Sequence, residues 1–231
     1  MLEMFPDSDA AAQAAADGVA EALSAAIATR GKATLVATGG RSPGPVYDRL
    51  RAAKLDWSRV SVTLSDERFV PPSSPDSNAG LLQRRLFSGP PAAAAFVPLW
   101  SDVATSDLAA AAADPAVAAL APFDVVMLGM GEDGHIASLL PGAAFLPAAM
   151  DLSRPAAAMG VPAGVGSPPM PRITLTLKAL LESRAIFLLI AGEVKRDVVA
   201  RAAAGADLPV RGILAQDRVP VRVLWAPSHG Q

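Results

Sequence analysis

Apolar residues recur along this chain at two spacings, which predict helices and strands respectively. Residues 8–30 are alanine-rich, with an apolar side chain at every fourth position from 19 to 27, a pattern typical of an amphipathic helix. Ser8 or Asp9 can cap the first turn of this helix, and Gly31 follows its last turn. We expect this helix to have a structural role.

Shorter segments are continuously apolar or alternate between apolar and polar residues, as strands do. The strands expected from these patterns are 33–37, 60–64, 96–99, 123–128, 156–161, 172–177, 185–190 and 221–225. Helices are expected between them, through Tyr47 and Leu50 and at 80–87, 102–121, 179–183 and 191–199. Strands that alternate with helices predict one α/β domain over residues 1–231, with a largely parallel sheet flanked by helices.

The pattern does not define how far the helix at 102–121 extends, or whether residues 210–214 are helical. Pro115 is expected to interrupt the helix at 102–121, because proline lacks the N–H that a helix interior requires. Residues 210–214 fit either the start of a helix or a short extended piece.

Residues 125–142 carry the clearest candidate chemistry. The apolar run at 125–128 suits a strand buried on both faces. Three glycines follow within six residues, and His135 comes directly after them. Because glycine has no Cβ, the backbone of this loop can approach a ligand closely. About one turn of helix is expected after His135, ended by Pro141.

The glycines of this loop fit the Gly-x-Gly-x-x-Gly fingerprint of dinucleotide-binding proteins, but the context argues against it. The motif lies mid-chain, and Glu132 and Asp133 would face a pyrophosphate unfavourably. The alternative is that the loop brings Asp133 and His135 to the edge of a small-molecule site, where the imidazole acts as a general base. A histidine held there for structural reasons alone is the competing interpretation.

Polar residues also follow two other expected strands. Residues 38–43 combine two glycines, a hydroxyl and a helix start, which fit either an anion site or an ordinary tight turn. Residues 65–71 place three consecutive ionisable side chains at a strand end, where open α/β sheets bind ligands. A solvated loop of charges is the competing interpretation of the second segment.

Composition narrows the class of protein. Of 231 residues 52% are hydrophobic, yet no run approaches the ~18 apolar residues of a membrane span. The net charge of −2 argues against a general nucleic-acid binder. The chain has no cysteine, and His135 with scattered carboxylates lacks the spacing of a metal site. Without a thiolate or a Gly-x-Ser-x-Gly elbow, direct activation of water or proton shuttling is favoured over covalent catalysis. No signal-peptide pattern is evident, so a cytoplasmic location is expected.

Taken together, these segments resemble the 6-phosphogluconolactonase family. Five motifs occur in the family's order, at 38–43, 65–71 with 76–78, 128–142, 171–177 and 192–195. The resemblance implies a Rossmann-like fold shared with glucosamine-6-phosphate deaminases. It also implies a cofactor-free hydrolase of the pentose phosphate pathway that converts 6-phospho-D-glucono-1,5-lactone to 6-phospho-D-gluconate. The expected partner is this small sugar phosphate lactone, with no nucleic acid, membrane or metal, and the expected state is a monomer or homodimer.

The resemblance implies roles by position. His135 matches the family's water-activating base, while Asp66 and Arg68 match its charged active-site residues. Arg172 and Lys195 match its cationic substrate ligands. The other residues expected at the substrate and its phosphate are Gly39, Gly40, Arg41, Ser42, Asn78, Gly131, Asp133 and Gly134. N–H groups of the glycine-rich loop are candidate donors to the oxyanion. Which cation binds the phosphate is left open at this point.

The deaminases are the nearest rival within this resemblance. They carry a glutamate five residues after the histidine, whereas this chain has Leu140, which cannot transfer a proton. A regulator that only binds a sugar phosphate would be expected to have lost His135 or its charged neighbours, and all are present. This chain also departs from the family at Lys178, where proline is usual, and in the short segment after Trp225. We expect both departures to affect stability or packing more than chemistry.

Overall fold

The chain folds into two β-sheets and their surrounding helices, and the computed structural model describes residues 2–228, so that His229 lies outside it. The strands are β1 (Leu2–Met4), β2 (Ala33–Ala37), β3 (Val60–Leu64), β4 (Asp66–Arg68), β5 (Ala95–Phe96), β6 (Val125–Gly129), β7 (Ala158–Val161), β8 (Arg172–Leu175), β9 (Ile186–Ala191) and β10 (Val221–Ala226). The helices are α1 (Ser8–Arg30), α2 (Gly44–Leu50), α3 (Asn78–Arg85), α4 (Ser106–Ala118), α5 (Leu146–Met150), α6 (Leu177–Leu181), α7 (Glu193–Ala203) and α8 (Arg211–Leu214), with 3₁₀ turns at Trp57–Arg59 and Pro90–Ala93.

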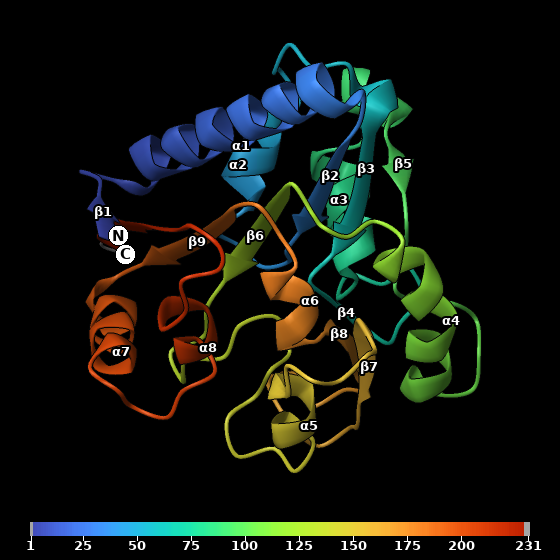
Figure 1. Cartoon of the computed structure of the whole chain (residues 1–231), viewed down its shortest axis with the longest axis vertical. Helices are drawn as coiled ribbons and strands as arrows, with labels where there is room; N and C mark the ends of the chain where they lie inside the picture. Colours follow the sequence, from blue (N-terminus) through green and yellow to red (C-terminus); the bar gives the residue numbers. More distant parts are fainter. Residues whose placement is uncertain (1, 229–231) are drawn as a thin grey trace.

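The larger sheet is parallel throughout its paired strands. Its seven strands lie in the order β1-β10-β9-β6-β2-β3-β5. Helix α1 crosses the strands and packs against β2, β6, β9 and β10, with α2 beside it (Figure 1). This arrangement confirms the α/β fold with a largely parallel sheet flanked by helices. Helix α8 settles the open assignment at 210–214, whereas three-residue β1 at the sheet edge was too short for a pattern to reveal.

The smaller sheet is antiparallel and joins segments far apart in sequence. Its strands lie in the order β4-β8-β7, and together with α5 they form the end of the molecule away from α1 (Figure 1). A solvated loop was one of the two interpretations of the charged segment after β3, but Asp66 and Arg68 pair with Thr174 and Arg172 of β8. Three charged residues carry no apolar alternation, so the pattern could not reveal this strand.

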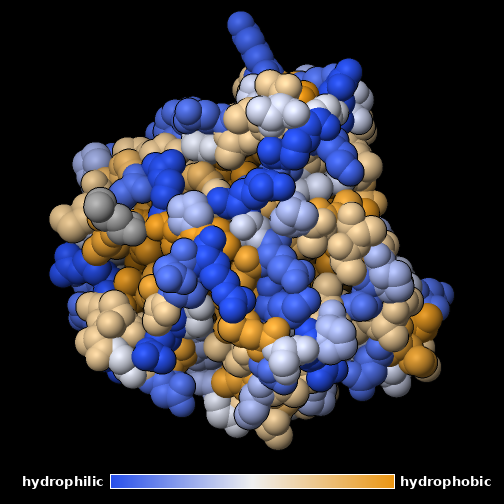
Figure 2. Space-filling view, in the orientation of Figure 1, coloured by the Kyte–Doolittle hydropathy of each residue, from blue (hydrophilic) through white to orange (hydrophobic). Residues whose placement is uncertain are grey.

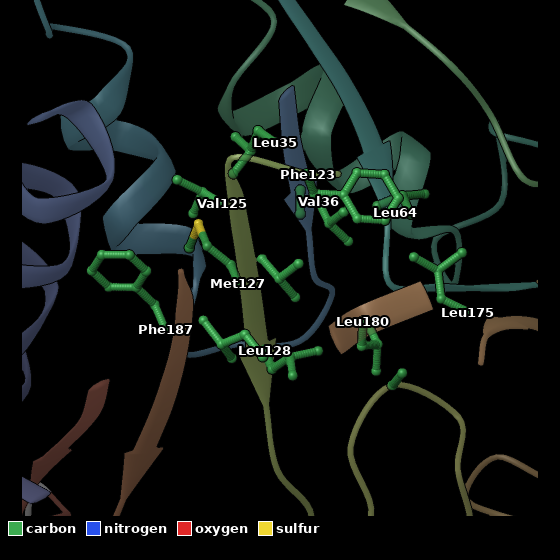
Figure 3. Close-up of a cluster of buried hydrophobic side chains, with 14 of the residues drawn as sticks. Leu35, Val36, Leu64, Phe123, Val125, Met127, Leu128, Leu175, Leu180 and Phe187 are labelled. Atoms are coloured by element: carbon green, nitrogen blue, oxygen red, sulfur yellow. The ribbon is translucent and has the colours of Figure 1, made fainter. Parts of the chain in front are cut away.

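Strand β6 lies at the centre of the core. Val125 to Leu128 are fully buried, as the apolar run predicts. Val125 and Met127 lie on the side of Phe187, and Leu175 and Leu180 lie on the other side of the strand (Figure 3). Among residues 2–228, no helix is long and apolar enough to cross a membrane. On the face seen in Figure 2, hydrophilic side chains form a band through the middle, bordered by apolar surface.

The structure corrects the expected N-terminal cap of α1 and confirms the expected residue after its last turn. Asp7, not Ser8 or Asp9, caps α1, and it accepts a hydrogen bond from the Ala10 N–H at 2.8 Å. Gly31 follows α1 in the left-handed conformation, as expected. Pro115 does not interrupt α4, because the helix ends soon after it and loses little by the missing donor.

The segment after His135 is not helical, contrary to the expectation. Single bridges join Ile136 to Met130 and to Leu139, and Ala137 has a positive φ of 49°. The loop is folded back on itself, since the Gly131 N–H donates to the His135 carbonyl at 3.0 Å. These local hydrogen bonds replace those that a helical turn would have made.

Candidate active site

A cavity of about 240 Å³ opens at the carboxyl ends of β2, β3, β6 and β9, which are neighbours in the sheet. The chain runs from β2 to β3 in one direction across the sheet, and β6 and β9 lie on the other side of β2. Open α/β sheets bind ligands at such a switch point. The residues expected at the site that line the cavity are Gly39, Gly40, Arg41, Ser42, Asp66, Arg68, Asn78, Gly131, His135, Arg172 and Lys195. Asp133 and Gly134 do not line it.

His135 lines the cavity and is hydrogen-bonded to Asp133, which does not line it. Its Nδ1 lies 2.6 Å from Asp133 Oδ1, and the same oxygen accepts the His135 backbone N–H at 3.1 Å. A carboxylate on Nδ1 selects the tautomer in which Nδ1 carries the proton and Nε2 is left as the base. Asp133 therefore orients the histidine, a role that the sequence left unassigned.

The two glycines that flank Asp133 shape the loop in different ways. A Cβ on Gly131 would lie 2.3 Å from Nδ1 of His135, so the imidazole packs directly against the glycine. Gly134 has a φ of 83° and its carbonyl accepts the Val210 N–H at 3.0 Å. The N–H groups of Gly131 and Gly134 donate within the loop, to His135 and Gly131. They are therefore occupied and are poor candidates for the oxyanion donors that the sequence suggested.

Asp66 is buried in the cavity wall and is held by two hydroxyls. Its Oδ1 accepts from Ser65 Oγ at 3.0 Å, and its Oδ2 accepts from Ser138 Oγ at 2.7 Å. Ser138 Oγ in turn accepts a hydrogen bond of 3.4 Å from Nη1 of Arg172. Ser138 links the histidine loop to Asp66 and Arg172, and sequence reasoning did not single it out.

Arg172 and Arg68 enter the cavity from paired positions on β8 and β4. The carbonyl of Pro168 accepts a hydrogen bond from Nη2 of Arg172 at 3.0 Å, and the carbonyl of Asp76 accepts one from Nη1 of Arg68 at 2.7 Å. Nε of each arginine is buried and has no partner within residues 2–228. Burial lowers the pKa of Arg172, and the nearby Asp66 opposes that shift. Both arginines line the cavity, so the guanidinium N–H groups that face it can reach a ligand, whereas the buried Nε atoms cannot.

Lys195 lies in the first turn of α7 and is half-buried. Over the described part of the chain, the side chains of Lys195 and Arg41 form no hydrogen bond or ion pair. Burial lowers the pKa of the Lys195 ammonium, the charge of Glu132 opposes this, and the charge of Arg41 adds to it. The turn before α7 is fixed by Trp225, whose indole N–H donates to the Gly192 carbonyl at 2.9 Å.

Asn78 closes the cavity between β2 and β4. Its amide Nδ2 donates to the Asp66 carbonyl at 2.8 Å. A Cβ on Gly39 would lie 1.9 Å from Asn78 Oδ1, so the amide occupies the space that only glycine leaves free. This contact sets the shape of the turn at 38–43.

The cavity combines one oriented imidazole with four cations, on Arg41, Arg68, Arg172 and Lys195, and one carboxylate, on Asp66. Such a surface favours a small ligand that carries negative charge, and the imidazole can move a proton at its edge. Within residues 2–228, no group of three or more His, Asp or Glu side chains is arranged to hold a metal ion.

The chain is similar to known proteins over nearly its whole length. The profile of the family described as glucosamine-6-phosphate isomerases/6-phosphogluconolactonase matches residues 6–225. A Caulobacter vibrioides protein named 6-phosphogluconolactonase is 43% identical, with 97% of each chain covered. The crystal structure of a 6-phosphogluconolactonase from Shewanella baltica has a TM-score of 0.90 at 35% identity, covering 98% of this chain and 97% of that one. A monomeric glucosamine-6-phosphate deaminase shares the fold, with a TM-score of 0.78 at 20% identity and 96% of each chain covered.

Proposed function

The chain belongs to the glucosamine-6-phosphate isomerase/6-phosphogluconolactonase family, and we propose that it hydrolyses 6-phospho-D-glucono-1,5-lactone to 6-phospho-D-gluconate with His135 as the base. The observation that carries the proposal is the pairing of His135 with Asp133 beside a cavity lined by cations. The reaction belongs to the oxidative pentose phosphate pathway, and we expect it in the cytoplasm.

The proton transfer follows from the histidine's orientation. With Nδ1 facing Asp133, Nε2 accepts a proton from a water molecule as that water attacks C1 of the lactone. The Asp133 carboxylate then stabilises the imidazolium that forms. A δ-lactone is an activated ester, so a nucleophilic side chain is not required. The proton passes from the imidazolium to the ring oxygen that leaves C1, which opens the ring to the acid.

The substrate's phosphate dianion is held by cations that lack carboxylate partners. Over the described residues neither Lys195 nor Arg172 forms an ion pair, and both side chains line the cavity. With the turn at residues 38–42, these two side chains form the phosphate cradle. Arg41 at the rim adds to the local positive charge.

Arg68 is the arginine that we assign to the carbonyl oxygen of the lactone. Because the N–H groups of Gly131 and Gly134 already donate within the loop, the developing oxyanion needs another donor. A guanidinium N–H of Arg68, which lines the cavity, supplies one, and the buried Asp66 balances the charge of Arg172 beside it.

Deamination of glucosamine 6-phosphate is the alternative activity in this family. Leu140 stands where we expect the deaminases to carry a glutamate, and here it packs against Ala143 and Val161 in a small apolar cluster. No group at this position can transfer a proton to a sugar ring. Hydrolysis of the lactone is therefore favoured over ring opening.

A direct assay tests the proposal. Purified protein is expected to accelerate hydrolysis of 6-phosphogluconolactone above its spontaneous rate in buffer treated to remove metals, with glucosamine 6-phosphate left unchanged. Release of ammonia from glucosamine 6-phosphate, or no turnover of either compound, would count against it.

A further inference from the structure

Glu67 is a fully buried carboxylate that lies between two cavity residues without lining the cavity itself. It occupies the middle of β4, flanked by Asp66 and Arg68. Neighbouring side chains of a strand point to opposite faces, so Glu67 points away from the face that Asp66 and Arg68 present to the site. No ion pair joins it to a cation anywhere in residues 2–228. The proposed mechanism gives this charge no role.

All four acceptor positions of the Glu67 carboxylate are used. Oε1 accepts the backbone N–H groups of Arg68 at 2.8 Å and Asn78 at 2.7 Å. Oε2 accepts the Ala79 N–H at 2.7 Å and the Ser77 hydroxyl at 3.0 Å. An ionised carboxylate is an acceptor only, with about four lone-pair sites, so this environment matches the ionised form.

These bonds tie two elements of the active site together. Three of the four donors belong to the start of α3, and the fourth is the backbone of Arg68 on β4. A further hydrogen bond joins the start of α3 to β4: Asn78 Nδ2 donates to the Asp66 carbonyl at 2.8 Å. Glu67 thus fixes the distance between the Arg68 and Asn78 backbones, whose side chains both line the cavity.

We propose that Glu67 is a positioning residue of the active site, which sets the placement of Arg68 and Asn78 through their backbone N–H groups. This role rests on the proposed function in one respect: the ligand whose binding tests it, 6-phosphogluconate, is the expected product. Burial raises the pKa of Glu67, and the hydrogen bonds to its carboxylate oppose that shift.

Glu67→Gln isolates the effect because it preserves the shape of the side chain. The amide oxygen can still accept from Arg68 and Asn78, and the amide nitrogen can donate to Ser77 Oγ. The remaining Ala79 N–H then faces an N–H donor, which costs one buried hydrogen bond and shifts the start of α3. Glu182→Gln is the matched control, because the Glu182 carboxylate is exposed and pairs with Lys178 at 2.8 Å, away from the cavity.

A double-mutant cycle with Arg68→Met separates positioning from stability. Calorimetric binding of 6-phosphogluconate is measured for wild type, Glu67→Gln, Arg68→Met and the double variant, beside thermal unfolding of each. We expect Glu67→Gln to weaken binding about tenfold in the wild type, but less than about threefold when Arg68 is already replaced. The unfolding temperature is expected to fall by the same amount in both backgrounds, and Glu182→Gln to bind as the wild type does.

Two outcomes would overturn the inference. In the first, Glu67→Gln binds 6-phosphogluconate as tightly as the wild type. In the second, Glu67→Gln weakens binding by the same factor with and without Arg68→Met, as a general loosening of the fold would give. If Glu67→Gln fails to fold, Ser77→Ala removes one of the four bonds, and an undiminished affinity in that variant would equally contradict the role. A wild-type protein that neither binds 6-phosphogluconate nor hydrolyses the lactone would refute the proposed function instead.

Discussion

Nδ1 of His135 lies 2.6 Å from Oδ1 of Asp133, two residues earlier in the same loop. The pair forms because Gly134 turns the chain back with a positive φ, which brings the imidazole over the carboxylate. Asp133 thereby favours the tautomer that carries the proton on Nδ1, and Nε2 forms no hydrogen bond within residues 2–228. His135 is 31% exposed in its side chain, so it stays in reach of water and of a ligand in the cavity.

Replacing either member of this pair should affect turnover more than binding. His135→Ala is expected to lower kcat by ~10²–10⁴-fold, because the base is lost. Asp133→Asn keeps a base but no longer stabilises the imidazolium, so we expect a smaller loss of ~10–10²-fold with KM nearly unchanged. Steady-state kinetics with the lactone measure both. A kcat for His135→Ala equal to that of the wild type would exclude the histidine as the base.

Gly131→Ala should displace the imidazole without altering any charge. The new Cβ would lie 2.3 Å from Nδ1 of His135 and 2.5 Å from Oδ1 of Asp133, so the pair must move. We expect a fall in kcat of ~10²-fold, because a small misplacement of a catalytic group is costly. Gly44→Ala is the control, since its Cβ meets Arg85 only at 3.6 Å, an ordinary contact. Equal kinetics for the two variants would contradict the close packing at Gly131.

Asp124 lies away from the active site, where β2 and β6 begin, and should govern stability alone. Its carboxylate accepts from Arg30 at 2.5 Å, from Arg184 at 3.3 Å and from the Thr34 N–H at 2.9 Å, and it is buried. Asp124→Ala leaves the buried Thr34 N–H unpaired, while the partly exposed Arg30 and Arg184 can turn to water, so it is expected to cost ~1–3 kcal/mol of unfolding free energy. Urea unfolding measures this loss, with the KM for the lactone unchanged.

Asp56→Ala serves as the comparison for that measurement. Asp56 pairs with Arg59 at 2.9 Å on the surface, so its removal is expected to leave the urea midpoint where it is in the wild type. If Asp124→Ala unfolds at the wild-type midpoint as well, the contacts of Asp124 do not stabilise the junction of α1, β2 and β6.

The sequence predicted which residues gather at the cavity better than it predicted the contacts between them. Parallel strands end at one edge, so residues after β2, β3 and β6 were bound to meet, and Arg41, Asp66 and His135 do. Ser138 and Glu67 escaped notice because their importance depends on pairing between β4, β8 and α3, which no local pattern encodes. The residues after His135 are compatible with a helical turn, but short-range hydrogen bonds within the loop form in its place.

Lys195→Ala should weaken binding of the phosphorylated ligand specifically. The ammonium has no carboxylate partner in the described residues, so a phosphate dianion gains a charge-assisted contact without displacing another. We expect KM for 6-phosphogluconolactone to rise by ~10–10²-fold, with much less effect on kcat. Gluconolactone without the phosphate is the matched substrate. An equal rise in KM for both lactones would argue against contact between Lys195 and phosphate.

The lowered pKa of Lys195 also predicts how binding depends on pH. An ammonium is charged below its pKa and neutral above it, so burial makes Lys195 lose its charge at a lower pH than an ordinary lysine. The phosphate is a dianion throughout this range, and affinity should therefore fall as pH rises through the lowered pKa, beginning below the usual value of ~10.4. In Lys195→Arg the guanidinium stays charged, so the alkaline loss is expected to disappear. Calorimetric titration of 6-phosphogluconate, which unlike the lactone is stable to base, gives the Kd at each pH for both proteins. Parallel pH profiles for the wild type and Lys195→Arg would assign the alkaline loss to another group.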